Sequence, residues 1–179
     1  PDGYSLEFGG EYESSSEARS NLLGPVTFFF VGMVLIVIML FNALRQPLII
    51  FLCIPLALIG VTAGLLGFGQ PFGFMALLGF LSLSGMIIKN AVVLIDQIDL
   101  EIRDDKDTFN AILDSSVSRL RPVLMAAMTT VLGMTPLVLD PFYRGMSVTI
   151  MGGLTFGTVL TLIVVPVLYS IFFRSAGKT

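Results

Sequence analysis

Five long runs of apolar residues, joined by short polar segments, make up most of the sequence after the first two dozen residues. A helix needs about 20 mostly apolar residues to cross the roughly 30 Å hydrocarbon core of a bilayer, and each run approaches or exceeds this length. Prolines stand at or near the start of four runs, where a missing N–H costs a helix little. The pattern predicts an all-α membrane protein, a bundle of five transmembrane helices. The runs comprise residues 25–44, 47–68, 72–95, 122–139 and 148–173.

The first 20 residues are more polar than the rest of the chain. The stretch YSLEFGGEYE alternates apolar and polar residues around a glycine pair, which is typical of a strand end or a hairpin. Ser14 and Glu17 have the spacing of a capping box, which opens a helix. We therefore expect residues 1–20 to be the end of a water-soluble domain with a lead-in helix. The chain begins at Pro1 and shows no signal peptide, so we expect it to be a piece of a longer protein.

The composition agrees with a membrane location and excludes several kinds of site. Of the 179 residues, 55% are hydrophobic and 13% are charged, whereas soluble domains carry about 25% charged residues. The chain has no histidine and one cysteine, Cys53. An intrachain disulfide, a cysteine-based metal site and a histidine general base are therefore excluded. We expect neither a cofactor nor a metal site nor enzymatic activity.

The basic residues between the apolar runs predict the orientation of the chain. Cytoplasmic loops of membrane proteins carry an excess of Lys and Arg. Arg19 and Arg144 fall on one side of the membrane, and seven basic residues fall on the other, which we take as cytoplasmic. The N-terminus is then outside and the C-terminus inside. The seven residues are Arg45, Arg103, Lys106, Arg119, Arg121, Arg174 and Lys178.

The long cytoplasmic connection has a helical pattern of its own. Within residues 107–121 apolar residues recur at helical spacing, which predicts an amphipathic helix along the inner membrane face. An ordinary solvated helix is the alternative. The apolar positions are Phe109, Ile112, Leu113, Val117 and Leu120.

Small residues at four-residue spacing occur twice, at Gly60 with Gly64 and at Gly153 with Gly157. Such pairs allow close helix packing in lipid, although some of them are only tolerated glycines. They indicate a packed bundle.

A lysine interrupts the third apolar run. A lysine at the centre of a membrane helix costs about 2.5–3.5 kcal/mol on insertion scales, and such residues usually mark a pathway or a partner. Ser82, Lys89 and Asp96 are seven residues apart in turn, so they share one helix face, with Asn90 beside it. Snorkelling toward the interface is the alternative, but helix side chains lean toward the N-terminus and here into the membrane. No acidic residue lies within a run at mid-membrane depth, so we expect a partner for Lys89 outside this chain.

Three further polar residues have simple explanations. Thr129 and Thr130 lie within the fourth run, where a hydroxyl usually bonds the carbonyl four residues earlier. Arg119 is expected at the inner boundary, where the excess of positive charge on the cytoplasmic side is a sufficient reason for it.

Several stretches in the same order resemble the closing part of the AcrB-type permeases. These stretches are GMIIKNAVVLIDQ, AILDSSVSRLRPVLMAAMTTVLGMTPLVL and IMGGLTFGTVLTLIVVPVLYSIFF, and GYSLEFGGEYE is similar to the end of the periplasmic porter region. The AcrB-type permeases are the hydrophobe/amphiphile efflux branch of the resistance-nodulation-division (RND) superfamily. The resemblance implies transmembrane helices eight to twelve of a proton-driven multidrug antiporter of the bacterial inner membrane. It further implies a homotrimer that works with a periplasmic adaptor and an outer-membrane channel.

The resemblance also implies roles for particular residues. The family's proton relay pairs a lysine in helix ten with two aspartates in helix four, and Lys89 matches that lysine, with Asn90 as its neighbour. Arg119 matches an arginine of the same route. The family often has a threonine where this chain has Ala126, and Thr130, on the same face, is the candidate substitute. The drug-binding site is expected outside this chain, in the periplasmic region.

Two alternatives to multidrug export stay open. One is a sister permease that exports metal ions or lipids. Metal export needs methionine or carboxylate ligands along the path, whereas the methionines of this chain are scattered. The other is a structural or assembly protein that transports nothing. The upstream part of the gene would distinguish these readings.

Overall fold

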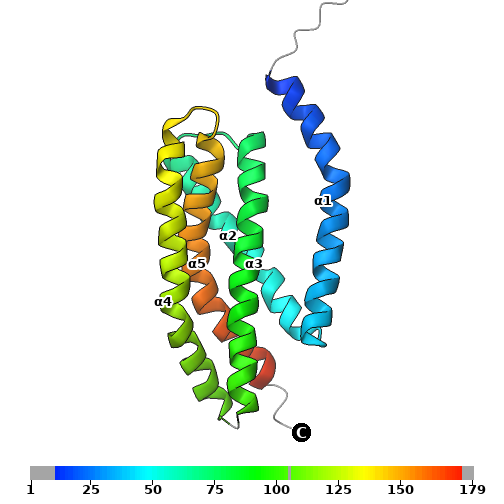
Figure 1. The fold of residues 1–179 in the computed structure, drawn as a ribbon, viewed down its shortest axis with the longest axis vertical. Helices are drawn as coiled ribbons and strands as arrows, with labels where there is room; N and C mark the ends of the chain where they lie inside the picture. The colour runs from blue at the N-terminus through cyan, green and yellow to red at the C-terminus, as the bar shows by residue number, and fades with distance from the viewer. Residues whose placement is uncertain (1–10, 105, 175–179) are drawn as a thin grey trace, which may run out of the picture. The chain divides into compact units, whose positions relative to one another are not determined.

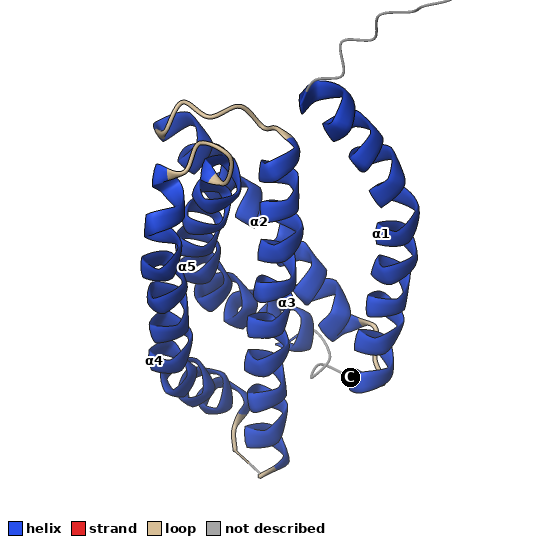
Figure 2. Ribbon diagram, turned by 45° about the horizontal axis from the view of Figure 1, so that its top comes forward, coloured by secondary structure: helices blue, strands red, loops and turns tan. Residues whose placement is uncertain are grey.

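The computed structural model describes residues 11–104 and 106–174. These residues form five α-helices and one short 3-10 helix, and they contain no strand, which confirms the predicted all-α class. Figures 1 and 2 show the helices and the short connections between them. In chain order the elements are α1 (Glu11–Phe41), α2 (Arg45–Gly67), α3 (Phe74–Arg103), α4 (Thr108–Met134), η1 (Thr135–Leu139) and α5 (Arg144–Arg174).

Five segments are long and apolar enough to cross a membrane, judged by length and composition, among the residues described. Their apolar windows have mean hydropathies between 1.7 and 2.6. Backbone groups cannot bond water in lipid, so helices, which satisfy them internally, are the form that such apolar segments take. The five segments are Gly24–Phe41, Arg45–Gly67, Phe74–Arg103, Thr108–Leu139 and Arg144–Phe173.

The chain divides into two compact units, Pro1–Asn42 and Ala43–Thr179. The first unit contains α1, a single helix of 31 residues with Pro25 inside it. The expected lead-in helix and the first apolar run are thus one helix. It ends just before Asn42, which has a positive φ of 47°, a conformation that asparagine tolerates better than most residues. The predicted strand or hairpin falls mainly on residues 1–10, outside the described residues.

In the second unit α5 is the central helix and contacts α2, α3 and α4. The closest approach is to α2. Gly60 and Gly64 of α2 meet Gly152 and Gly153 of α5 so tightly that a Cβ on Gly60 would stand 2.7 Å from the Gly152 carbonyl oxygen. The contact therefore depends on glycine, and it agrees with the packed bundle that the four-residue spacing indicated. Gly157 is also at a contact, since a Cβ there would meet Ile87 of α3 at 2.9 Å.

The fourth apolar run is not separated from the predicted amphipathic helix before it. The sequence predicted an amphipathic helix over 107–121 and a span beginning at Pro122, but α4 runs without a break from Thr108 to Met134. The helix continues because its buried side is continuous across the proline. Ala111, Ile112 and Ser115 before it, and Val123 and Ala127 after it, are all buried. Packed neighbours compensate for the one backbone hydrogen bond that proline removes.

Candidate functional site: the polar face of α3

The two sides of α3 differ in burial and polarity. Leu83, Ile87, Ala91, Leu94 and Ile98 are buried. Positions on the other side are exposed, and they carry small, polar or charged residues over most of the membrane-spanning part. They are Ser82, Gly85, Lys89 and Asp96. A helix with an apolar side against its neighbours and a polar side away from them is incomplete in a membrane, because lipid cannot solvate the polar side.

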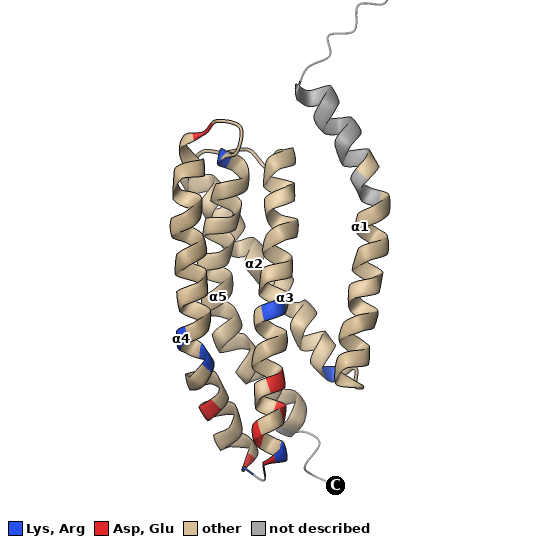
Figure 3. Cartoon of the chain, viewed as in Figure 1, with Lys and Arg blue, Asp and Glu red and all other residues tan. Residues whose placement is uncertain are grey.

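Lys89 is exposed on this polar side. Among the described residues of α2 to α5, its ammonium group has neither an ion pair nor a hydrogen bond. Asn90, next to it, is half-buried. The charged residues drawn in Figure 3 gather toward one end of α3 and α4.

Arg119 contacts α3 through a neutral side chain. Its Nη2 donates a hydrogen bond of 2.6 Å to Oε1 of Gln97, and both side chains are half-buried. Gln97 lies eight residues beyond Lys89, which is about 12 Å along a helix. The structure therefore places Arg119 against the helix of Lys89 but not beside Lys89 itself.

A group of charged residues continues from Gln97 to the end of α3. The Gln97 Nε2 donates to Oε1 of Glu101 at 3.3 Å. The Lys106 ammonium lies 2.5 Å from Glu101 and 3.2 Å from Asp114 of α4. Hydrogen bonds to these two carboxylates raise the pKa of Lys106 above its ordinary value. Sequence reasoning missed this group, although Gln97 and Glu101 have the four-residue spacing of interacting helix pairs.

A second hydrogen bond joins α3 to α5. The Tyr169 hydroxyl donates to Oδ1 of Asp99 at 2.5 Å. Tyr169 is 1% exposed, and its ring stacks on Phe173 at a centroid distance of 4.2 Å. A buried tyrosine usually finds a partner for its hydroxyl, but nothing in the sequence identified Asp99, 70 residues away, as that partner.

The hydroxyls of the fourth run bond locally, as the simple explanation predicted. Thr129 donates to the Met125 carbonyl at 2.8 Å, and Thr130 donates to the Ala126 carbonyl at 2.9 Å. Each hydroxyl still has lone pairs that can accept a hydrogen bond. Thr130 is thus on the helix turn that includes Ala126, without a side-chain bond to α3.

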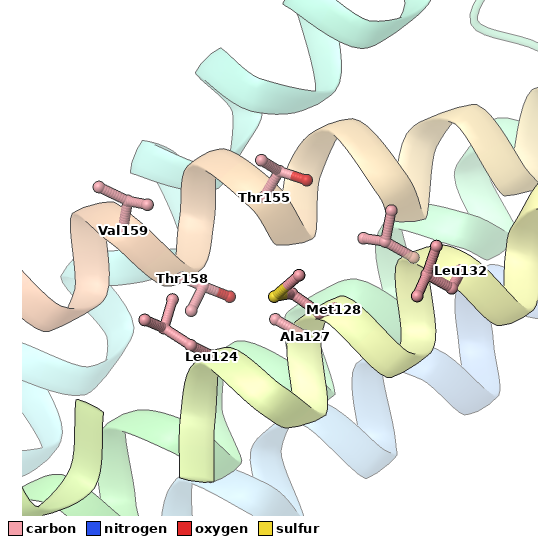
Figure 4. A pocket seen from close by; sticks show the side chains of 8 residues that line it. Leu124, Ala127, Met128, Leu132, Thr155, Thr158 and Val159 are labelled. Carbon is pink, nitrogen blue, oxygen red and sulfur yellow. The ribbon is translucent and has the colours of Figure 1, made fainter. Parts of the chain in front are cut away.

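Two further features bear on ligands. A cavity of about 300 Å³ lies between α4 and α5 (Figure 4). Its wall is almost entirely apolar, and the buried Thr158 hydroxyl there has no hydrogen-bond partner. No cluster of three or more His, Cys, Asp or Glu side chains that could hold a metal ion exists among the described residues. The cavity is lined by Leu124, Ala127, Met128, Val131, Leu132, Thr155, Thr158 and Val159.

In multi-pass membrane proteins, an ionisable residue within a membrane helix usually marks an ion or substrate pathway or a partner contact. The chain belongs to the AcrB/AcrD/AcrF family, whose sequence model matches residues 1–173. The predicted membership of the RND permeases is therefore confirmed.

Individual relatives include proteins named for metal resistance and for multidrug resistance. Protein HelA of Legionella pneumophila is 35% identical over 96% of this chain and 17% of its own length. The nickel and cobalt resistance protein CnrA of Cupriavidus metallidurans is 31% identical over 99% of this chain and 17% of its own length. The multidrug resistance protein MdtC of Pectobacterium atrosepticum is 30% identical over 93% of this chain and 17% of its own length.

A solved structure agrees with the fold. The crystal structure of a heavy metal efflux pump matches with a TM-score of 0.79 and 29% identity, over 93% of this chain and 17% of that one. The chain thus spans about 17% of the length of these relatives.

Proposed function

We propose that this chain is the C-terminal membrane part of a proton-driven efflux permease in which Lys89 is the central residue of the proton relay. The observation that carries the proposal is the position of Lys89. It is a charged residue within a membrane-spanning helix, on the side of α3 that α2, α4 and α5 leave exposed. An unpaired ammonium in lipid is costly, so a carboxylate from elsewhere in the permease must lie against this face.

The relay follows from the strength of such a pair. Opposite charges in a low-dielectric interior attract strongly, and either charge alone is costly there. When the carboxylates bind protons, Lys89 loses its partners and the helices rearrange. Asn90, Arg119 and Thr130 are the further members of the proposed relay. Asn90 adjoins Lys89, and Arg119 contacts α3 through Gln97.

The whole permease is proposed to lie in the bacterial inner membrane as a homotrimer, with a periplasmic adaptor and an outer-membrane channel as partners. Within it, the N-terminal segment of this chain is proposed to be periplasmic and the C-terminus of this chain cytoplasmic, as the distribution of basic residues predicts. The first 20 residues are proposed to be the end of the periplasmic porter domain, and residues 107–121 to lie at the inner membrane face.

We propose multidrug compounds as the exported substrates, because the motifs around Lys89 and Arg119 resemble those of the multidrug branch. Export of divalent metal ions is the second candidate. It is favoured by similarity to CnrA and to the heavy metal efflux pump. Any metal path would lie mainly outside the described residues, since they contain no cluster of His, Cys, Asp or Glu that could hold a metal ion.

The test is Lys89→Met in the full-length permease, made in cells that lack their own efflux pumps. Methionine keeps much of the side-chain length and removes the charge, so the protein should insert normally and lose export. Lys89→Arg keeps the charge with a different shape and is also expected to impair export. The matched control is Lys178→Met, the same change beyond α5, which should export like the wild type.

Susceptibility to dyes and drugs and to nickel, cobalt, zinc and cadmium salts is measured at equal protein levels. Loss of drug resistance alone with Lys89→Met supports multidrug export, and loss of metal resistance alone supports the second candidate. Unchanged resistance to both would refute the role of Lys89.

A further inference from the structure

A second line of polar side chains runs along α3, next to the face that carries Lys89. Gln97 is seven residues beyond Asn90, and Glu101 is four residues beyond Gln97, so all three share one helix face. All three side chains are half-buried. This line begins at a proposed relay residue and ends in the charged group around Lys106.

Gln97 is the point where this line meets α4. Arginine can only donate hydrogen bonds, so the atom of Gln97 that lies 2.6 Å from Arg119 must be its carbonyl oxygen. The amide nitrogen then faces Glu101, which accepts at 3.3 Å. Glutamine can accept from the cation and donate to the carboxylate at the same time. A carboxylate at position 97 would lose the second bond, and an apolar side chain would lose both.

The contacts beyond Gln97 close a ring between α3 and α4. Glu101 pairs with Lys106, and Lys106 pairs with Asp114 on the helix that also carries Arg119. On the other side, Tyr169 of α5 bonds Asp99 of α3 independently. The end of α3 beyond Lys89 is thereby attached to α4 and to α5. Among the described residues, Gln97 provides the hydrogen bond that joins α3 to the Arg119 guanidinium.

We propose that Gln97 is a positioning residue of the permease, which holds the Arg119 guanidinium against α3 so that Arg119 moves with the helix that carries Lys89. The inference rests on the proposed proton-driven function. Gln97 itself exchanges no proton. Its amide fixes where the half-buried positive charge of Arg119 stands. Without the amide, Arg119 has no partner on α3 and its side chain is free to turn away.

The experiment is a double-mutant cycle on the full-length permease in proteoliposomes, with the initial rate of gradient-driven substrate transport as the readout. Methionine matches the length of glutamine and forms no comparable hydrogen bond. Gln97→Met is expected to lower the rate about tenfold, in line with the loss of a hydrogen bond to a charged group. Arg119→Met is expected to lower it by at least as much. In the Arg119→Met background, Gln97→Met should cause no further loss, because residues that act through one contact are not additive.

The matched control is Gln70→Met, the same change in the connection between α2 and α3, which should transport like the wild type. A wild-type rate for Gln97→Met, or for Arg119→Met, overturns the inference. So does an equal loss from Gln97→Met with and without Arg119, because that result indicates a general structural role. If Gln97→Met fails to insert, the same cycle with Gln97→Asn, which retracts the amide by one methylene, decides in the same way.

Lys89→Met, measured in parallel, separates this inference from the proposed function. If Lys89→Met abolishes transport and Gln97→Met does not change it, only the positioning role fails. If Lys89→Met transports normally, the proposed relay fails, whatever the cycle shows.

Discussion

Replacing Gly60 by alanine tests the contact between α2 and α5. The new methyl group would stand 2.6 Å from Cβ of Phe156 and 2.7 Å from the carbonyl oxygen of Gly152. Both atoms belong to or adjoin the backbone of α5, so neither can move without shifting the helix. Overpacking of this kind costs about 1–3 kcal/mol, and the upper end applies against backbone atoms. Alanine regains about 1 kcal/mol in helix propensity. The net expectation is a destabilisation of roughly 2 kcal/mol.

The matched control is Gly133→Ala in α4, where an added Cβ has nothing within 4 Å. This variant keeps only the gain in helix propensity, so its stability should equal or exceed that of the wild type. Cys53 is the only cysteine of the chain, and it is 2% exposed in the core. A dye that fluoresces on reaction with a thiol therefore reports unfolding of the chain in detergent.

For a chain of this size, 2 kcal/mol lowers the thermal midpoint by about 4–8 °C. If the thermal midpoint of Gly60→Ala equals or exceeds that of Gly133→Ala, α2 and α5 accommodate the methyl group at no cost, and the contact between them is not tight.

Three further outcomes are expected. Tyr169→Phe removes the hydroxyl that donates to Asp99 and should destabilise the chain by about 1–2 kcal/mol. The same change at the exposed Tyr143 should leave the stability unchanged. Equal thermal midpoints for the two variants would contradict this prediction. Cysteines introduced at Asp104 and Asp140 report the orientation of the chain in the membrane. An impermeant thiol reagent on intact cells should label Asp140→Cys only, and labelling of Asp104→Cys would contradict the predicted topology. Thr130→Val should reduce export less than Lys89→Met, because the Thr130 hydroxyl bonds its own helix; equal losses would make Thr130 a principal relay residue.

Much of the fold was predictable from the sequence because a membrane narrows the choices. Apolar segments of about 20 residues have one way to satisfy their backbone in lipid without strand partners, so five runs meant five helices. The face of α3 that carries Ser82, Lys89 and Asp96 followed from helical periodicity. The family followed from motifs in a fixed order. The orientation and the relay roles of Lys89, Asn90, Arg119 and Thr130 stay predictions.

Tertiary structure decided which helix each face meets. Periodicity places Gln97 and Asp99 on α3, but it says nothing of the arginine 22 residues away or the tyrosine 70 residues away that bond them. The sequence pattern also predicted that a helix starts at Pro122, whereas the continuous buried side of α4 keeps that helix intact across the proline. The physical reason is the same in each case. Helix formation depends on residues within one or two turns, so it can be read locally, whereas the choice of neighbour depends on how whole helix surfaces fit together.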